Sequence, residues 1–506
     1  MDKLTKELAQ QWIELLKERN GLCDTGLNTE SIEDLAGLLF NKSIQQIGND
    51  TVALIQLNGF NALAVFGAND AGFDADCIND EAQASFCRLS HTNAQLLRKV
   101  LPFTAPSPLA DKDVTFGLGD RLGIASPGHI RLFENKKAYP VLAQQSVREL
   151  DLTARTYEEV LDAATWAVFQ EGYDKPWGAD GDHLKTVDWV KKALDIGFTM
   201  ITADVSDYIR NEFDSLDDSA VSQAYDKLDR QYRDDIEKRY LELSLELDTG
   251  DTIEFTKSDL ARIALIYKDA VEHALTLYEA GTATGKEYDF EFSIDETETP
   301  TLPQAHVFAA SEAIHKGIRI SSLAPRFIGE FQKGIDYIGD KAQFEKQFRV
   351  HAAIARHFGY RMSIHSGSDK FMVFPIIGKY TQGRFHVKTA GTNWLQAVEV
   401  IAQQEPDFFR KLYCYAIEVF PIAKQYYHIT PNLDNLPNLD ELEDEQLDSV
   451  FTNPDARQVV HVTYGEILRN PDFKDQIYST LEKHIEAYWL SLEKHIGKHL
   501  ELLAVQ

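Results

Sequence analysis

Short apolar runs that end in polar or glycine-rich tips alternate with stretches of helical periodicity from residue 114 to about residue 390. Each run is rich in β-branched or aromatic residues, which is typical of a buried strand. The eight predicted strands cover residues 114–118, 139–143, 178–183, 198–203, 288–294, 318–323, 361–364 and 384–387. This count and span are typical of an α/β protein with a (β/α)₈ TIM-type barrel. An open doubly wound sheet is the competing architecture, but the regular repetition favours closure.

The segments outside these units have a different pattern. Residues 4–19 predict a helix, and the apolar runs 52–57 and 62–66, separated by Asn58-Gly59, predict a hairpin. The gap between strands 4 and 5 is too long for one crossover and includes strongly charged helical sequence. We therefore predict a helical insertion at about 208–286. The predicted domains are an N-terminal α/β extension (1–110), the catalytic barrel (111–425) and a C-terminal helical segment (426–506), which ends in one long helix over 472–503.

Charge and composition argue against several classes of binding partner and location. The net charge of −29 argues against nucleic acid and anionic membranes as partners, because both need a basic surface. No stretch approaches the roughly 18 apolar residues of a spanning helix, and the N-terminus lacks the apolar run of a signal peptide. Four cysteines without CxxC spacing are typical of a reducing compartment. We expect a soluble cytoplasmic protein that acts on a small molecule; the sequence does not determine its oligomeric state.

Nearly every predicted strand ends in ionisable residues, where barrel enzymes place their chemistry. Side chains alternate along a strand, so His365 shares a face with Ser363, and His386 shares a face with Lys388. With His183 from across the barrel, His365 and His386 are predicted to form a site for a divalent cation of the Zn, Mn, Co or Ni type. The alternative is that one or more of these imidazoles bonds to substrate or backbone.

Acidic and basic tips supply candidates for proton transfer and substrate binding. Asp182 is adjacent to His183 and is a candidate base, with Glu296 or Glu298 acting from another side. Glu291 is a further candidate for the catalytic acid if the strand bulges and side chains change face. The alternative for Glu298 is that it only shapes its loop. The candidate substrate-binding residues are Arg326, Lys370, Lys388 and Gln145. The three cations suit a carboxylate or phosphate, although salt bridges to neighbouring acids would also explain them.

Several histidines receive no functional role. His351 and His357 fall on a predicted helix and are expected to be packing or surface residues. His484, His495 and His499 lie on the predicted C-terminal helix among lysines, and we expect them to be solvated.

Long motifs in this chain resemble the tagaturonate epimerase family. They are Phe116-Gly-Leu-Gly-Asp-Arg-Leu-Gly, Gly178-Ala-Asp-Gly-Asp-His-Leu-Lys, Ser322-Leu-Ala-Pro-Arg-Phe-Ile-Gly-Glu-Phe-Gln-Lys-Gly, Ser363-Ile-His-Ser-Gly-Ser-Asp-Lys and Gly383-Arg-Phe-His-Val-Lys-Thr. The resemblance runs from about residue 114 to 464. It implies metal-dependent interconversion of D-tagaturonate and D-fructuronate in galacturonate breakdown, with neutral ketohexoses such as tagatose and fructose as further substrates of some members.

A more distant likeness suggests a mechanism. Asp182-His183 and His365-Ser-Gly-Ser look like elements of class II aldolases, in which the His binds zinc and the Asp moves protons. The two keto-uronates differ at the carbon β to the ketone, which enolisation cannot invert. The likeness therefore implies retro-aldol cleavage and re-addition, with Asp182 as base, Glu296 or Glu298 opposite it, and the three histidines as ligands. The rival hypotheses are a true aldolase on a keto-sugar acid and a non-catalytic subunit that stabilises one. Transient oxidation would need a nicotinamide, and no GxGxxG motif is present.

Overall fold

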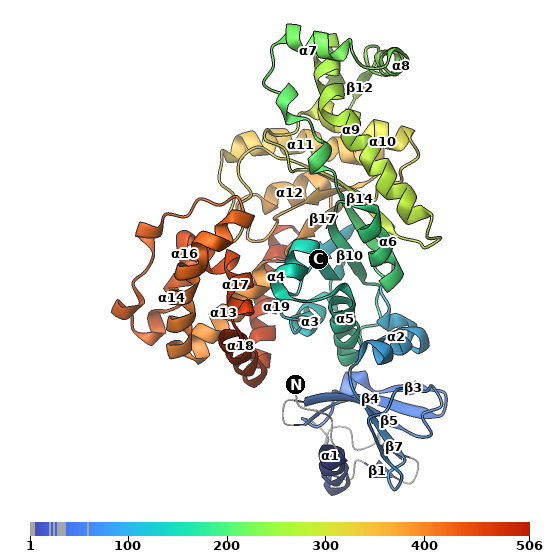
Figure 1. Ribbon diagram of the computed structural model, residues 1–506, viewed down its shortest axis with the longest axis vertical. Helices are drawn as coiled ribbons and strands as arrows, with labels where there is room; N and C mark the ends of the chain where they lie inside the picture. Colours follow the sequence, from blue (N-terminus) through green and yellow to red (C-terminus); the bar gives the residue numbers. More distant parts are fainter. Residues whose placement is uncertain (1–5, 20–21, 24–25, 28–36, 58–59) are drawn as a thin grey trace.

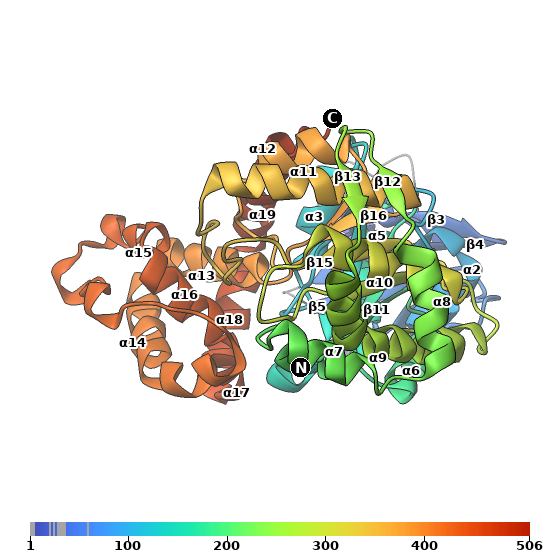
Figure 2. The ribbon, with the colours of Figure 1, turned by 90° about the horizontal axis from the view of Figure 1, so that it is seen from above.

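A central barrel carries a small sheet at one end, a helical insertion at the other and a body of helices on one side (Figure 1). The computed structural model describes residues 6–19, 22–23, 26–27, 37–57 and 60–506. Seen from above, the C-terminal helices lie beside the barrel (Figure 2). No helix in the described ranges has both the length and the apolar character needed to cross a membrane.

The barrel is closed and all its strand pairs are parallel, which confirms the predicted (β/α)₈ fold. Its strands are β8 (Val114–Gly117), β9 (Tyr139–Ser146), β10 (Gly178–Leu184), β11 (Met200–Asp204), β14 (Asp289–Ile294), β15 (Ser322–Pro325), β16 (Arg361–Ile364) and β17 (Phe385–Lys388). Every predicted strand overlaps one of them. The largest shift is in β15, which begins four residues after the predicted start at Ile318.

Helices surround the barrel and bury its outward-facing apolar side chains. They are α3 (Ser126–Phe133), α4 (Val147–Thr153), α5 (Tyr157–Glu171), α6 (Val187–Ile196), α9 (Lys257–Thr282), α10 (Pro303–His315), α11 (Lys341–Phe358) and α12 (Phe374–Thr381). Local sequence sets several of their ends. Ser146 and Thr156 begin α4 and α5 with capping boxes, and Gly172 and Gly359 end α5 and α11 in the left-handed conformation.

The N-terminal extension is a five-stranded antiparallel sheet with helices on its faces. Its elements are α1 (Lys6–Glu18), β3 (Gln45–Ile47), β4 (Asp50–Leu57), β5 (Phe60–Phe66), β6 (Cys77–Asn79), β7 (Ala84–Cys87) and α2 (His91–Val100), with a separate two-residue pair β1 (Leu22–Cys23) and β2 (Gly26–Leu27). The predicted hairpin is confirmed by the antiparallel register from Thr51↔Phe66 to Leu57↔Phe60. Its turn, Asn58-Gly59, lies outside the described residues.

The insertion between β11 and β14 is present as predicted and also contains a hairpin. It consists of α7 (Asp218–Tyr225), α8 (Arg230–Tyr240), β12 (Ser244–Glu246) and β13 (Thr252–Glu254), and α9 returns the chain to the barrel. Val221, Ile236 and Ile253 pack into the same hydrophobic cluster as the barrel. The insertion therefore shares the core of the barrel.

The C-terminal body has its own hydrophobic cluster, formed by α13 (Thr392–Gln404), α14 (Pro406–Ala423), α15 (Ser449–Thr452), α16 (Pro454–Val462), α17 (Tyr464–Arg469), α18 (Pro471–Lys483) and α19 (Ile485–Leu502). The single long helix predicted at 472–503 is wrong, because the chain breaks at His484 into α18 and α19. In α19, Trp489 and Leu492 belong to this cluster, whereas Ile496 and Leu500 belong to the barrel core. The last helix thus joins the two bodies.

Candidate active site

A cavity of about 400 Å³ opens at the C-terminal ends of the barrel strands. Pockets for small molecules typically hold about 300–1,000 Å³, so this volume suits a compact ligand. Its lining residues come from the ends of β9, β10, β11, β14, β16 and β17, and also from the loop at residues 333–334 and from the C-terminal body. The C-terminal helices therefore form part of the site.

The position of His183 depends on an irregularity in β10. In a regular strand His183 would face away from Asp182, because adjacent side chains alternate. The pairing of β10 with β11 shifts register between Gly181 and Leu184, and His183 has a φ of 53°, a left-handed value that is uncommon for a side-chain-bearing residue. As a result both Asp182 and His183 line the cavity.

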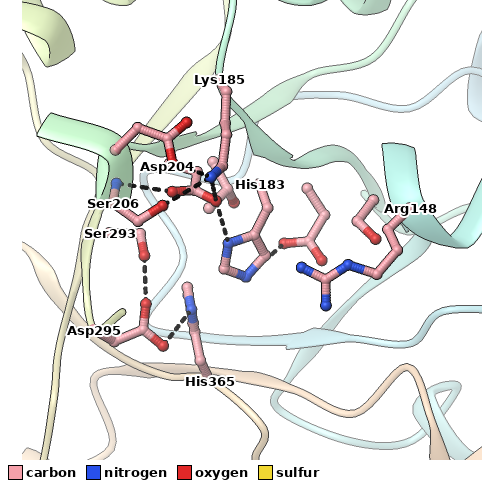
Figure 3. A network of polar contacts seen from close by, with 12 residues as sticks. Arg148, His183, Lys185, Asp204, Ser206, Ser293, Asp295 and His365 are labelled. Carbon is pink, nitrogen blue, oxygen red and sulfur yellow. Dashed lines mark hydrogen bonds and ion pairs between the residues drawn. The ribbon is translucent and has the colours of Figure 1, made fainter. Parts of the chain in front are cut away.

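Two imidazoles and two carboxylates face one another at the mouth of the barrel (Figure 3). His183 Nδ1 lies 3.5 Å from Asp204 Oδ2, and His365 Nδ1 lies 3.1 Å from Asp295 Oδ2. The two rings have their centroids 4.9 Å apart. Burial alone would lower the pKa of His183, but the carboxylates of Asp182 and Asp204 outweigh it and raise the pKa to about 10.

This cluster fits a divalent cation. One ligand atom each from His183, Asp204 and Glu296 lies within 4.8 Å of the other two. The buried Nδ1 atoms of His183 and His365 make no hydrogen bond of normal geometry among the described residues, although each is directed at a carboxylate. Such a mixed set of imidazole nitrogen and carboxylate oxygen suits Zn, Mn, Co or Ni.

Lys388 is enclosed by carboxylates and is not free to bind an anion. Its Nζ lies 2.6 Å from Asp182, 3.0 Å from Asp180 and 2.9 Å from Glu291. Burial alone would lower the pKa of Lys388, but these carboxylates raise it well above its ordinary value. Burial would likewise raise the pKa of Asp182, yet Lys388 and His183 hold it well below its usual range. Asp182 is therefore ionised at neutral pH and can accept a proton.

His386 does not line the cavity. The register pairs His386 with Ser363, so it lies two residues below the level of His365, about 7 Å deeper along the strand direction. Its Nδ1 lies 2.9 Å from Thr115 Oγ1, and burial lowers its pKa to about 3. The alternation of side chains correctly predicted that His386 points into the barrel. The strand register, which alternation does not give, puts it in the layer of side chains beneath the site. Its position gives no support to a role as metal ligand.

The other predicted residues are distributed over different environments. Lys370 is buried and donates hydrogen bonds to the backbone carbonyls of Gln332, Ile335 and Ser368. Gln145 is buried and does not line the cavity. Arg326 and Glu298 line an adjoining hollow that shares His365 and Asp295 with the main cavity. Of the predicted acids, Asp182 and Glu296 line the main cavity.

Two histidines of the C-terminal helix were wrongly expected to be solvated. His499 is fully buried, and its Nε2 accepts a hydrogen bond from the Asp369 backbone N–H at 3.0 Å. His495 Nε2 lies 2.6 Å from Asp369 Oδ1, and Arg457 lies 2.9 Å from Asp369 Oδ2. Because the His499 nitrogen is already an acceptor, this group connects α19 to the loop after β16 by hydrogen bonds. By contrast, His351 is buried and His357 is exposed, as predicted.

The cavity lining includes residues to which the sequence assigned no role, among them Asp204, Asp295, Arg148, Lys333 and His461. Lys333 belongs to the quoted motif ending Phe-Gln-Lys-Gly, which offered a signal that the strand-tip argument did not use. His461 lies on α16, more than seventy residues beyond the last barrel strand. No local pattern connects it with the barrel.

Comparison with known proteins agrees with the fold. The family model described as tagaturonate epimerase matches residues 40–503. A tagaturonate/fructuronate epimerase of Thermotoga maritima is 43% identical over 419 residues, covering 83% of this chain and 86% of that protein. A glycerol complex of the fructuronate-tagaturonate epimerase of Cohnella laeviribosi superposes with a TM-score of 0.90 and 46% identity, covering 94% of this chain and 99% of that one. A second complex of that enzyme, with two glycerols, gives a TM-score of 0.92 and 44% identity over 98% and 100% of the two chains. With matches of this extent, the chain belongs to the tagaturonate epimerase family.

Proposed function

We propose that this protein interconverts D-tagaturonate and D-fructuronate by retro-aldol cleavage and re-addition, with a divalent cation. The observation that carries the proposal is that the cavity places an ionised carboxylate, Asp182, beside a cluster of imidazoles and carboxylates suited to a cation. Family membership supplies the substrate pair. The inverted carbon is β to the ketone, so its C–H proton is not acidic and deprotonation there cannot drive the inversion.

In this proposal Asp182 takes the proton of the β-hydroxyl group. The O–H electron pair then forms an aldehyde, the adjacent C–C bond breaks, and its electron pair passes into the ketone to give an enolate. After the aldehyde turns over, the same pair attacks its opposite face. The new alkoxide takes up a proton that Glu296, which lines the cavity, relays from solvent, and Asp182 returns its proton to solvent. Glu298 lies in the adjoining hollow and is the second candidate for this step.

The cation would be held by Nδ1 of His183 and of His365 together with the carboxylates of Asp204 and Asp295. Glu291 would accept the N–H of His365 Nε2 at 2.7 Å and so orient the ring. When bound there, it supplies Lewis-acid polarisation of the ketone oxygen. Lys388 keeps Asp182 in position through a 2.6 Å ion pair. Lys388 thus orients the base and does not contact substrate.

An NMR assay with D-tagaturonate tests the proposal. We expect formation of D-fructuronate by the metal-loaded protein, loss of activity with a chelator, and recovery when Zn²⁺, Mn²⁺, Co²⁺ or Ni²⁺ is added back. In D₂O the inverted carbon should carry no deuterium. Deuterium at that carbon would rule out cleavage and rejoining, accumulation of three-carbon products would indicate an aldolase, and absence of conversion with every metal would overturn the assigned activity.

A further inference from the structure

Lys333 differs from the other cationic side chains deep in the cavity because its charge has no partner. Lys388 contacts three carboxylates, and Lys185 contacts Asp207 at 2.8 Å and Asp204 at 3.9 Å. Among the described residues, no carboxylate lies within ion-pair distance of Lys333, which lines the cavity. Lys333 is half-buried, and desolvation lowers its pKa by disfavouring the charged form. A ligand carboxylate would supply the counter-charge that the protein does not.

The backbone that carries Lys333 is held in place by buried polar side chains. Lys370 donates to the carbonyls on either side, at Gln332 (2.9 Å) and Ile335 (2.6 Å). From α16, Gln458 donates to the Lys333 carbonyl at 3.2 Å and Arg457 donates to the Gly334 carbonyl at 2.8 Å. Gly334 has a φ of 78°, which a glycine adopts without strain. The loop is thus positioned precisely enough to present one side chain to the cavity.

His461 supplies a second unsatisfied group in the same wall. It is 1% exposed and lines the cavity, and neither ring nitrogen has a hydrogen-bond partner among the described residues. It lies against the two glycines Gly334 and Gly391; a Cβ on Gly391 would collide with the ring. Burial holds the pKa of His461 well below its ordinary value, so the ring is neutral and offers one N–H donor. A buried donor left unpaired destabilises the protein, and a ligand that accepts its hydrogen bond would remove that cost.

We propose that Lys333 and His461 form the subsite for the carboxylate of a hexuronate substrate. The inference deepens the proposed function and rests on it. In a protein of net charge −29, with Asp182, Asp204, Asp295 and Glu296 around the cavity, an anionic substrate needs a local cation. A neutral ketohexose would leave both groups unpaired, so the subsite favours the uronate.

Arg148 is the competing cation. It is exposed at the rim, where its guanidinium donates to the Tyr426 carbonyl at 3.1 Å and lies 5.7 Å from the Tyr427 ring centre. Solvent screens a rim charge more strongly than a buried one. Lys333, with the smaller exposure and the more rigid support, is therefore the group assigned to the carboxylate.

Steady-state kinetics of the metal-loaded protein with D-tagaturonate test the assignment. We expect Lys333→Met to raise KM about 10- to 100-fold, the loss associated with one hydrogen bond to a charged group, with kcat retained within a few fold. Lys333→Arg should recover part of the loss. His461→Phe should also raise KM, and His461→Gln, which keeps a donor, should raise it less. Bound metal and melting temperature, measured on each variant, should match the wild type for Lys333→Met.

Lys185→Met is the matched control, because it removes a cation from the same cavity that is already paired; we expect it to lower kcat without the selective rise in KM. An unchanged KM in Lys333→Met, a loss confined to kcat, or a selective rise in KM in Arg148→Met instead would overturn the subsite. Absence of conversion by the wild-type protein would overturn the proposed function itself, so the two failures are distinguishable.

Discussion

Buried carboxylates already neutralise the charge of Lys388. We therefore expect its replacement to lower the stability of the protein and not to weaken substrate binding. Replacing it by Met would leave Asp180, Asp182 and Glu291 buried without their counter-charge. Removing one partner of a buried ion pair typically costs about 3–5 kcal/mol. We expect Lys388→Met to lose this much unfolding free energy in urea titrations. Lys379→Met, which breaks an exposed pair with Glu345, should lose less than about 1 kcal/mol. A stable Lys388→Met protein with a raised KM would instead support substrate binding by Lys388.

Asp182 and Asp180 make a matched pair, because both contact Lys388 but only Asp182 lines the cavity. An amide cannot accept the hydroxyl proton, so Asp182→Asn should lower kcat by about 10²–10⁴-fold, the usual contribution of a general base. KM should change little. Asp180→Asn, measured in the same assay, should lose far less. Equal losses in the two variants would show that both carboxylates act only by holding Lys388.

At the scale of the strand, alternation could be predicted from the sequence but register could not. The predicted faces are observed, because His365, one residue after β16, and Lys388 on β17 both contact Glu291 inside the barrel. Which residue of one strand lies beside which residue of the next depends on the tilt of the closed barrel. That is why His365 reached the cavity mouth and His386 did not. The bulge that turns His183 into the cavity is equally invisible to a rule of strict alternation.

Two glycines on the contact between α3 and α19 should respond oppositely to alanine. A Cβ on Gly128 would lie 2.8 Å from Trp489 Cα, too close for any real contact, whereas a Cβ on Gly497 would lie 3.7 Å from Leu132 Cδ1. In a helix interior, Gly→Ala normally stabilises by about 1 kcal/mol. Gly497→Ala should therefore raise the melting temperature. Gly128→Ala should lower it, because overpacking typically costs about 1–3 kcal/mol. Stabilisation by both substitutions would mean that the two helices are farther apart.

At the scale of the whole molecule, the barrel was predictable because each strand–helix unit repeats locally. The part of the site supplied by the C-terminal body was not. His461 packs against Gly334, and Arg457 donates a hydrogen bond to the Gly334 carbonyl. His499 accepts a hydrogen bond from the Asp369 backbone N–H. The two residues of each contact are more than 120 positions apart in the sequence. Periodicity gives the buried face of a helix but not its partner. The histidines of α19 were for this reason mistaken for surface residues.

Buried neutral histidines should make the whole protein sensitive to acid. Burial lowers the pKa of His129 and His351 to about 4, that of His499 to about 3, and that of His306 well below its ordinary value. In the unfolded chain these imidazoles have a pKa of about 6.5. Below this pH they therefore bind protons in the unfolded chain but not in the folded protein. Each imidazole then removes about 1.4 kcal/mol of unfolding free energy per pH unit. Carboxyls with raised pKa values oppose this loss where they titrate: desolvation raises the pKa of Asp180 to about 6 and also raises those of Asp162, Asp289, Glu399 and Glu493. Urea titrations of metal-free protein should therefore show a steep loss of stability from pH 6.5 to 5.

The His499→Gln variant tests the contribution of one imidazole, because glutamine does not titrate. Its unfolding free energy should change with pH by about one proton less than that of the wild type, whatever its stability at pH 7. An identical slope in the two proteins would mean that His499 is already protonated when folded.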